Sequence, residues 1–153
     1  VIIPTASSIP KEVSDNYLKG FSQLGCSNLR VLDIRNRLQS STKETIKILE
    51  NADAVMFSGG NQSKISKFIA GTDAHELLVH RYENERFVIA GTSAGAMAMS
   101  EQMIAGGSSK ESLNKGAVLM GKGLGLVKGL VIDTHFIRRS NGYSSKFTWA
   151  RTS

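Results

Sequence analysis

Short apolar runs alternate with amphipathic stretches along this chain of 153 residues, and no other feature limits its fold as strongly. A short apolar run indicates a buried strand, whereas apolar residues recurring every three to four positions indicate a helix. The apolar runs predict strands over 1–3, 29–34, 54–57 and 87–90, with short strands near Val118 and over 130–132. Helical periodicity predicts helices over 11–24, from the Ser-Thr-Lys-Glu capping box at 41–44 onward, over 65–69 and over 74–82.

Strands and helices that alternate in this way favour an α/β fold, a doubly wound and mostly parallel sheet with helices on both faces. Ligands of such sheets bind beyond the carboxyl ends of the strands. Two turns of small residues, at 58–62 and 91–95, each follow a predicted strand. We therefore expect both turns at the same edge of the sheet.

At this length, with 41% hydrophobic residues, the chain can bury the core of one domain. It opens inside a strand and ends without apolar periodicity, so we expect residues 1–153 to be one truncated domain. No apolar run approaches the roughly 18 residues of a membrane span, and no signal-peptide pattern stands at the start. Cys26 is the only cysteine, which argues against an internal disulfide and fits a reducing, cytoplasmic location.

The positive charge is concentrated in the last third of the chain. Residues 110–153 contain eight lysines and arginines but two acids, which accounts for the whole net charge of +6. A basic segment can bind nucleic acid or an anionic ligand. These basic residues are scattered and lack the interleaved aromatic side chains of a nucleic-acid platform. The pattern favours a solvated surface or a pocket for an acidic substrate, so we expect neither a nucleic-acid nor a membrane partner.

Residues 91–95, Gly-Thr-Ser-Ala-Gly, have the composition and the setting of a nucleophile elbow. The apolar run before them predicts a strand, and the small residues after them predict the start of a helix. In such an elbow the glycines permit a sharp turn and the serine hydroxyl is exposed at the head of the helix. The alternative interpretation is a turn of small residues without chemistry. The setting makes Ser93 the candidate nucleophile.

A serine hydroxyl needs a neighbouring base to take its proton. His135 follows the predicted strand 130–132 and is the candidate base, although a strand-end histidine bonded to backbone fits the same place. Backbone N–H groups must also stabilise an oxyanion. Ala94, directly after the nucleophile, and the turn containing Gly60 and Asn61 are the candidate donors.

Three further patterns favour structural interpretations. His75 and His80 are five residues apart, so their imidazoles diverge around a helix and predict surface histidines rather than a metal site. Alternate glycines at 121–125 match no nucleotide-binding fingerprint and predict a glycine-rich turn. Residues 105–116 are rich in Gly, Ser and Lys and predict a loop. We expect no metal and no cofactor.

Taken together, several segments resemble the cyanophycinase-like serine peptidases, a family that includes the aspartyl dipeptidases. These segments occur in that family's order and at close to its spacing; they are 3–7, 57–62, 89–96, 123–126 and 132–136. The resemblance covers roughly residues 1–139 and implies the flavodoxin-like fold of class I glutamine amidotransferases, with serine in place of their cysteine. It implies the following roles: Ser93 as nucleophile, His135 as general base, and Gly60, Asn61 and Ala94 as the oxyanion hole.

The resemblance also implies a substrate. Cyanophycinases cut cyanophycin, a poly-aspartate backbone carrying arginine on each side-chain carboxyl, to β-Asp-Arg dipeptides. The implied substrate contacts of this chain are Gln62, Asp133, Thr134 and Arg139. Asp133 suits a guanidinium and Arg139 suits a carboxylate. A homodimer is a further expectation.

Two departures from the family leave alternatives open. The family's triad glutamate follows the histidine, but residues 136–153 contain neither Asp nor Glu. Asp133 is a weak substitute, since it lies two residues from the histidine that it would orient. The family's spaced arginines also give way to Asn141 and Ser144. The alternatives are an aspartyl dipeptidase, a non-catalytic binding module that lacks the acid and, from the basic end, a nucleic-acid role.

Overall fold

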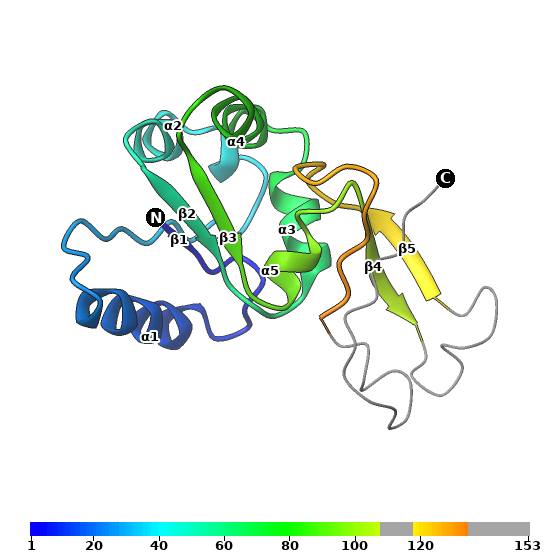
Figure 1. The fold of residues 1–153 in the computed structure, drawn as a ribbon, viewed down its shortest axis with the longest axis horizontal. Helices are drawn as coiled ribbons and strands as arrows, with labels where there is room; N and C mark the ends of the chain where they lie inside the picture. The colour runs from blue at the N-terminus through cyan, green and yellow to red at the C-terminus, as the bar shows by residue number, and fades with distance from the viewer. Residues whose placement is uncertain (108–117, 135–153) are drawn as a thin grey trace.

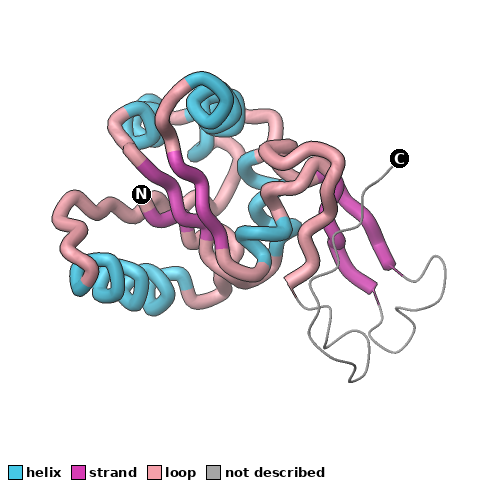
Figure 2. The backbone as a smooth tube through the Cα atoms, in the orientation of Figure 1, coloured by secondary structure: helices cyan, strands magenta, loops and turns pink. Residues whose placement is uncertain are grey.

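The computed structural model describes residues 1–107 and 118–134 (Figures 1 and 2). Strands and helices alternate along most of this length. In order, the elements are β1 (Ile2–Ile3), α1 (Pro10–Gln23), the 3-10 helix η1 (Gln39–Ser41), α2 (Lys43–Glu50), β2 (Ala54–Phe57), α3 (Gln62–Ile69), α4 (Asp73–Asn84), β3 (Val88–Gly91), α5 (Ala94–Met97), β4 (Gln102–Gly107) and β5 (Val118–Lys122). Within the described ranges, no helix is long and apolar enough to cross a membrane.

The central element of the fold is a parallel sheet in the order β1-β2-β3. Ile2 lies opposite Met56, and the four residues of β2 lie opposite the four of β3. On its other side, Ile2 forms a parallel bridge with Val31. If the bridged segment is counted as the second strand of the chain, the order is 2-1-3-4, as in flavodoxin-like sheets. The predicted α/β fold with a parallel sheet is confirmed.

The predicted strand over 29–34 is reduced to this bridge. Two backbone hydrogen bonds form it, from Ile2 N–H to the Arg30 carbonyl and from Leu32 N–H to the Ile2 carbonyl, both of 2.8 Å. The pairing cannot extend further along β1, because Pro4 directly follows β1 and has no N–H to donate to the next carbonyl. Leu32 is nevertheless buried, as its place in the predicted strand required.

Helices lie on both sides of the sheet, with α2 and α4 on one side and α1 on the other (Figure 1). Successive strand residues point to opposite faces, so the exposure of β2 identifies the better covered face. Val55 and Phe57 are buried in one cluster with Leu49 of α2 and Leu78 of α4. The core therefore lies between the sheet and these two helices.

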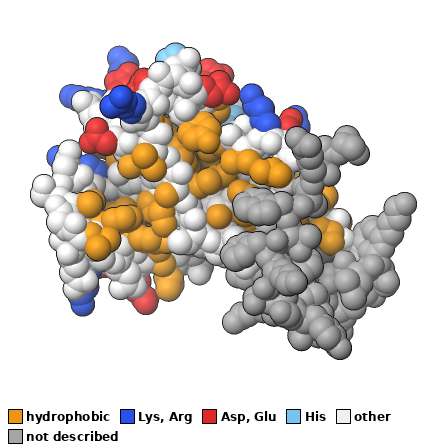
Figure 3. All heavy atoms as spheres, viewed as in Figure 1, with side chains coloured by type: hydrophobic (Ala, Val, Ile, Leu, Met, Phe, Trp, Pro, Cys, Tyr) orange, Lys and Arg blue, Asp and Glu red, His pale blue; other side chains and the backbone are white. Residues whose placement is uncertain are grey.

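The opposite face of the sheet, toward α1, is only partly covered. Val88 is 60% exposed, and Ala90 in the same strand is also exposed. Phe21 of α1, Met56, Val88 and Ala90 are among the residues that line a hollow of about 950 Å³. Figure 3 shows hydrophobic side chains gathered across the middle of the molecule, with charged side chains nearer its margins. Helices therefore cover both faces of the sheet, as predicted, but they cover the α1 face less completely than the α2–α4 face.

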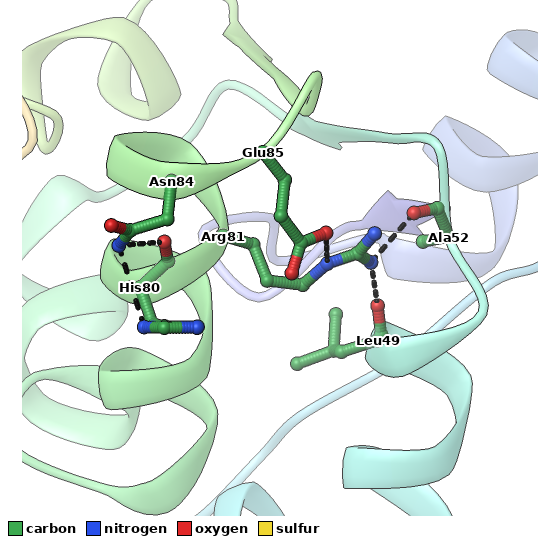
Figure 4. A network of polar contacts seen from close by, with 6 residues as sticks. All are labelled: Leu49, Ala52, His80, Arg81, Asn84 and Glu85. Carbon is green, nitrogen blue, oxygen red and sulfur yellow. Dashed lines mark hydrogen bonds and ion pairs between the residues drawn. The ribbon is translucent and has the colours of Figure 1, made fainter.

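Arg81 fixes α4 against the end of α2 (Figure 4). Its Nη1 donates to the carbonyl oxygens of Leu49 at 2.6 Å and Ala52 at 2.7 Å. Carbonyls at a helix C-terminus lack hydrogen-bond donors within the helix and carry partial negative charge. A guanidinium supplies both the donors and the opposite charge. Nε of Arg81 pairs with Glu85 at 2.7 Å, and the guanidinium lies 4.4 Å from the centroid of the Phe87 ring. One side chain therefore joins α2, α4 and the chain that enters β3.

The capping of α2 differs from the prediction by one residue. Thr42, not Ser41, is the N-cap, and its Oγ1 accepts a hydrogen bond from Thr45 N–H at 3.2 Å. An N-cap needs an extended backbone, which Thr42 has with φ −73° and ψ 147°. Ser41 is instead the last residue of η1.

β4 and β5 pair antiparallel, apart from the parallel sheet. The loop predicted over 105–116 is therefore wrong at its start, because 105–107 belong to β4. Met103 and Ile104, at the start of β4, are buried at 2% and 8% exposure. Their burial anchors the strand, so the small residues that follow can pair with β5. The strand predicted near Val118 is confirmed as β5.

The described residues form no continuous strand over 130–132, contrary to the prediction. The chain instead makes a parallel bridge at Val127 with Ser100. Gly125 and Gly129 have φ of 66° and 70°, so the backbone turns on both sides of Val127. These turns keep the paired segment short.

The unequal faces predict unequal costs for removing a valine side chain. Val55→Ala should lower the free energy of unfolding by about 2–3 kcal/mol, because it leaves a cavity in the core. Val88→Ala, the matched control in the neighbouring strand, should change it by less than about 0.5 kcal/mol. Denaturant unfolding followed by circular dichroism measures both. Equal losses would contradict the assignment of the core to the α2–α4 side.

Candidate active site

The segment 91–95 has the backbone of a nucleophile elbow. β3 ends at Gly91 and α5 begins at Ala94, so Ser93 lies on the turn between strand and helix. With φ 49° and ψ −113°, it is the only non-glycine residue of positive φ among residues 1–107 and 118–134. Such a conformation costs about 1–3 kcal/mol and persists only where the surrounding structure enforces it.

Backbone segments meet around this turn so closely that side chains would not fit. A Cβ on Gly91 would overlap the backbone of Gly95, and a Cβ on Gly95 would overlap the carbonyl oxygen of Phe57. The Thr92 N–H donates to that same carbonyl at 3.1 Å. β2, β3 and α5 are therefore in direct backbone contact, which enforces the direction of the turn.

The turn after β2 lies against Ser93. A Cβ on Gly59 would stand 3.4 Å from the Cβ of Ser93. Gly60 has a φ of 139°, and a Cβ there would overlap the carbonyl of Ala6. Because Ala6 follows β1, the carboxyl ends of three strands converge at this point. The two turns predicted to share an edge of the sheet are neighbours.

The structure distinguishes between the predicted oxyanion donors. The Asn61 N–H donates to the Ala6 carbonyl at 2.9 Å, and its Oδ1 accepts from Ser63 N–H at 2.9 Å, capping α3. The Asn61 N–H is thus engaged with Ala6 in this structure, so its predicted role as an oxyanion donor would require that bond to break. The Gly60 N–H donates no hydrogen bond within the described part of the chain. Ala94 is the first residue of α5, where N–H groups lack partners within the helix.

Gln62, a predicted substrate contact, makes a structural contact. Its Nε2 donates to the carbonyl of Ile104 in β4 at 2.6 Å. One turn along α3, the hydroxyl of Ser66 donates to the carbonyl of Lys122 in β5 at 2.6 Å. These two bonds hold the β4–β5 pair on α3, so the side-chain oxygen of Gln62 is the part left for a ligand.

The other predicted site residues come from the end of the chain. Asp133 is half-buried and Thr134 is exposed. His135 and Arg139 lie outside the described residues. The structure therefore brings together the nucleophile and the oxyanion turn, and the predicted base is outside what it describes.

The segment that leads to His135 is anchored near α5. The Ile132 N–H donates to Oγ of Ser100 at 3.1 Å. Ser100 is fully buried and lies three residues after the end of α5. Ile132, the residue before Asp133, is therefore held beyond the C-terminal end of the four-residue helix whose N-cap is Ser93.

His75 has a structural contact that the sequence did not predict. Its Nδ1 accepts from the Gly71 N–H at 3.0 Å, so Nε2 carries the proton and donates to the Leu124 carbonyl at 2.7 Å. His75 is half-buried and joins α4 to the glycine-rich turn. His80 is exposed beside Asn84, as Figure 4 shows. The described residues contain no group of three His, Cys, Asp or Glu that could hold a metal ion.

The sequence also gave no indication of a contact made by Tyr17. Its Oη lies 2.6 Å from Oγ1 of Thr92, the residue before Ser93. Tyr17 fits the apolar spacing of the helix predicted over 11–24, and that spacing says nothing of a partner 75 positions away.

Two helical glycines test the close packing of the elbow. Gly95→Ala should lower the free energy of unfolding by at least about 2 kcal/mol, because its Cβ would press on the Phe57 carbonyl. Gly20→Ala in α1 is the matched control, since a Cβ there meets nothing within 4 Å. It should raise the free energy by up to about 1 kcal/mol through helix propensity. Thermal unfolding measures both, and a neutral Gly95→Ala would argue against the packing described.

Comparisons with known proteins agree with this geometry. A family model described as peptidase family S51 matches residues 1–151. The cyanophycinase of Geminocystis herdmanii is 39% identical over 139 residues, which cover 91% of this chain and 51% of that protein. The cyanophycinase of Trichormus variabilis is 36% identical, over 91% of this chain and 47% of its own length. The chain thus spans about half the length of these curated relatives.

A solved structure has a similar fold. It is the crystal structure of a peptidase from an acI-B1 Actinobacterium, with a TM-score of 0.60 and 24% sequence identity. The match covers 88% of this chain and 54% of that chain. This likeness bears on the fold, while the family model bears on descent and extends over nearly every residue. The chain belongs to peptidase family S51, a family of serine peptidases.

Proposed function

We propose that Ser93 is the nucleophile of a peptidase that works by acyl transfer. The observation that carries this proposal is the strained conformation of Ser93, held between β3 and α5 and against the Gly59–Gly60 turn. A strained serine at such a strand-to-helix turn exposes its hydroxyl to a substrate carbonyl. A turn without chemistry would have no need for a costly backbone conformation at a non-glycine residue.

The reaction divides between a few groups. Oγ of Ser93 attacks the scissile carbonyl carbon while His135 accepts the hydroxyl proton, and the carbonyl π electrons move onto the oxygen. The N–H groups of Gly60 and Ala94 donate to this oxyanion. The C–N bond then breaks as His135 protonates the leaving amine. In the second half, His135 takes a proton from water, the water oxygen attacks the acyl carbon, and Oγ of Ser93 leaves with the proton from His135.

The substrate we propose is cyanophycin, with β-Asp-Arg dipeptides as the product. Support comes from the cyanophycinases to which the chain is similar. Asp133 would accept the guanidinium of an arginyl branch, Arg139 would bind a carboxylate, and the oxygen of Gln62 and the hydroxyl of Thr134 would complete the contacts.

The triad acid is the incomplete part of this assignment. Residues 136–153 contain neither Asp nor Glu, and the chain spans about half the length of its relatives. Loss of a triad acid costs about 10⁴-fold in turnover while the nucleophile and the oxyanion hole continue to act. Covalent labelling of Ser93 is therefore a more sensitive measurement for this chain than turnover.

Replacing the nucleophile gives the direct test. A fluorophosphonate should form an adduct on the wild-type chain, located at Ser93 by mass spectrometry, and Ser93→Ala should form none. Ser27→Ala, which removes an exposed serine near the amino end of β2, should label as the wild type does. In a full-length protein, Ser93→Ala should lower hydrolysis by about 10⁴-fold or more. An unlabelled wild-type chain would instead favour a binding module.

The substrate is tested at Asp133. Asp133→Asn should raise KM for cyanophycin by roughly 10- to 100-fold, the range expected for a lost hydrogen bond between charged groups. KM for an Asp-X dipeptide without a basic side chain should not change. Asp73→Asn, an exposed acid at the start of α4, is the matched control. If hydrolysis of Asp-X dipeptides exceeds that of the polymer, the chain is an aspartyl dipeptidase instead.

A further inference from the structure

Helix α1 is held only loosely by apolar packing. Of its residues only Ser14 is fully buried, while Val13, Tyr17, Leu18 and Phe21 are half-buried. An open hollow separates Phe21 of α1 from part of the sheet, so α1 packs against only part of this face. Specific contacts must therefore contribute to the place that α1 takes on the sheet.

The most direct such contact runs from α1 to the elbow. Oη of Tyr17 lies 2.6 Å from Oγ1 of Thr92. The Tyr17 ring stacks on Phe21 with centroids 6.1 Å apart and planes inclined by 20°. Because the stack restricts the ring, the phenol oxygen is presented to Thr92 at a small loss of side-chain entropy.

Thr92 connects this contact to the reacting region. Its N–H donates to the Phe57 carbonyl at 3.1 Å, and its carbonyl accepts from the Gly95 N–H at 2.9 Å. Its Oγ1 lies 3.8 Å from where a Cβ on Gly59 would stand. Thr92 thus lies between α1 and the turn that carries the Gly60 donor, and its backbone continues directly into the strained Ser93.

We propose that Tyr17 is a positioning residue for the nucleophile. Its hydrogen bond to Thr92 restrains the residue before Ser93 and so holds Oγ of Ser93 at the distance from the oxyanion donors that acylation requires. This inference rests on the proposed function. Tyr17 itself acts through Thr92 and needs no contact with the substrate.

The expected effect is on the rate of acylation. A strained turn persists only while several contacts enforce it, so removal of one lets Ser93 sample unreactive conformations. A hydrogen bond between two neutral hydroxyls is modest, so Tyr17→Phe should slow labelling by a fluorophosphonate roughly three- to tenfold. With a peptide substrate, kcat should fall and KM should stay within about twofold, since binding groups are untouched.

The test uses the whole chain and measures the labelling rate of Ser93. Tyr17→Phe and Thr92→Val should slow it equally, and the double variant should be no slower than either, because both remove one bond. Thr92→Ser keeps the hydroxyl and should label close to the wild-type rate. Tyr82→Phe, which removes a hydroxyl from an exposed tyrosine on α4, should have no effect.

The outcomes separate this inference from the function on which it rests. If the wild-type chain is not labelled at Ser93, the proposed function fails and takes the role of Tyr17 with it. If the wild type is labelled and Tyr17→Phe is labelled at the same rate, the role of Tyr17 alone is overturned. Additive effects of Tyr17→Phe and Thr92→Val would also overturn it. If Tyr17→Phe fails to fold, equal rates for Thr92→Val and Thr92→Ser would do the same.

Discussion

The direct contact of backbone with backbone at the carboxyl edge of the sheet is the constraint on which this structure depends. At Gly60, Gly91 and Gly95 a single added carbon would overlap a neighbouring backbone segment. Side chains normally keep strands, turns and helices apart, so contact without them leaves the backbone little room for alternative paths. Ser93 can be held in a costly conformation because the backbone segments around it, after β1, at the end of β2 and in α5, have no room to move.

The same constraint explains why the rest of the domain can be unevenly packed. The α2–α4 side holds the core, with Arg81 closing the end of α2, whereas the α1 side keeps a hollow of about 950 Å³ beside an exposed Val88. If the site depended mainly on side chains from α1, the hollow would leave those side chains poorly positioned. Here the proposed nucleophile and its candidate donors belong to turns fixed from the core side, and α1 adds a restraint from the other side.

Much of this could be predicted because the signals were local. The alternation of apolar runs and the elbow at 91–95 follow from neighbouring residues, and the structure bears out the parallel sheet and the strained serine. The sequence did not predict contacts that a distant partner decided. The Asn61 N–H is taken by Ala6, and Nε2 of His75 binds a carbonyl 49 positions away. The segment 29–34 had the right composition for a strand, but β1 pairs with it only at Ile2.

Two kinds of constraint divide the candidate site between them. The proposed nucleophile and oxyanion donors are defined by backbone conformation, which tolerates almost no change at the glycines around them. The proposed substrate contacts Asp133 and Thr134 are side chains on a separate segment, tied to the elbow through Ile132 and the buried Ser100. A change of side chain on that segment alters charge and shape without moving the elbow. Substrate preference can therefore vary within such a domain while the acyl-transfer geometry stays the same, because the two reside on different parts of the chain.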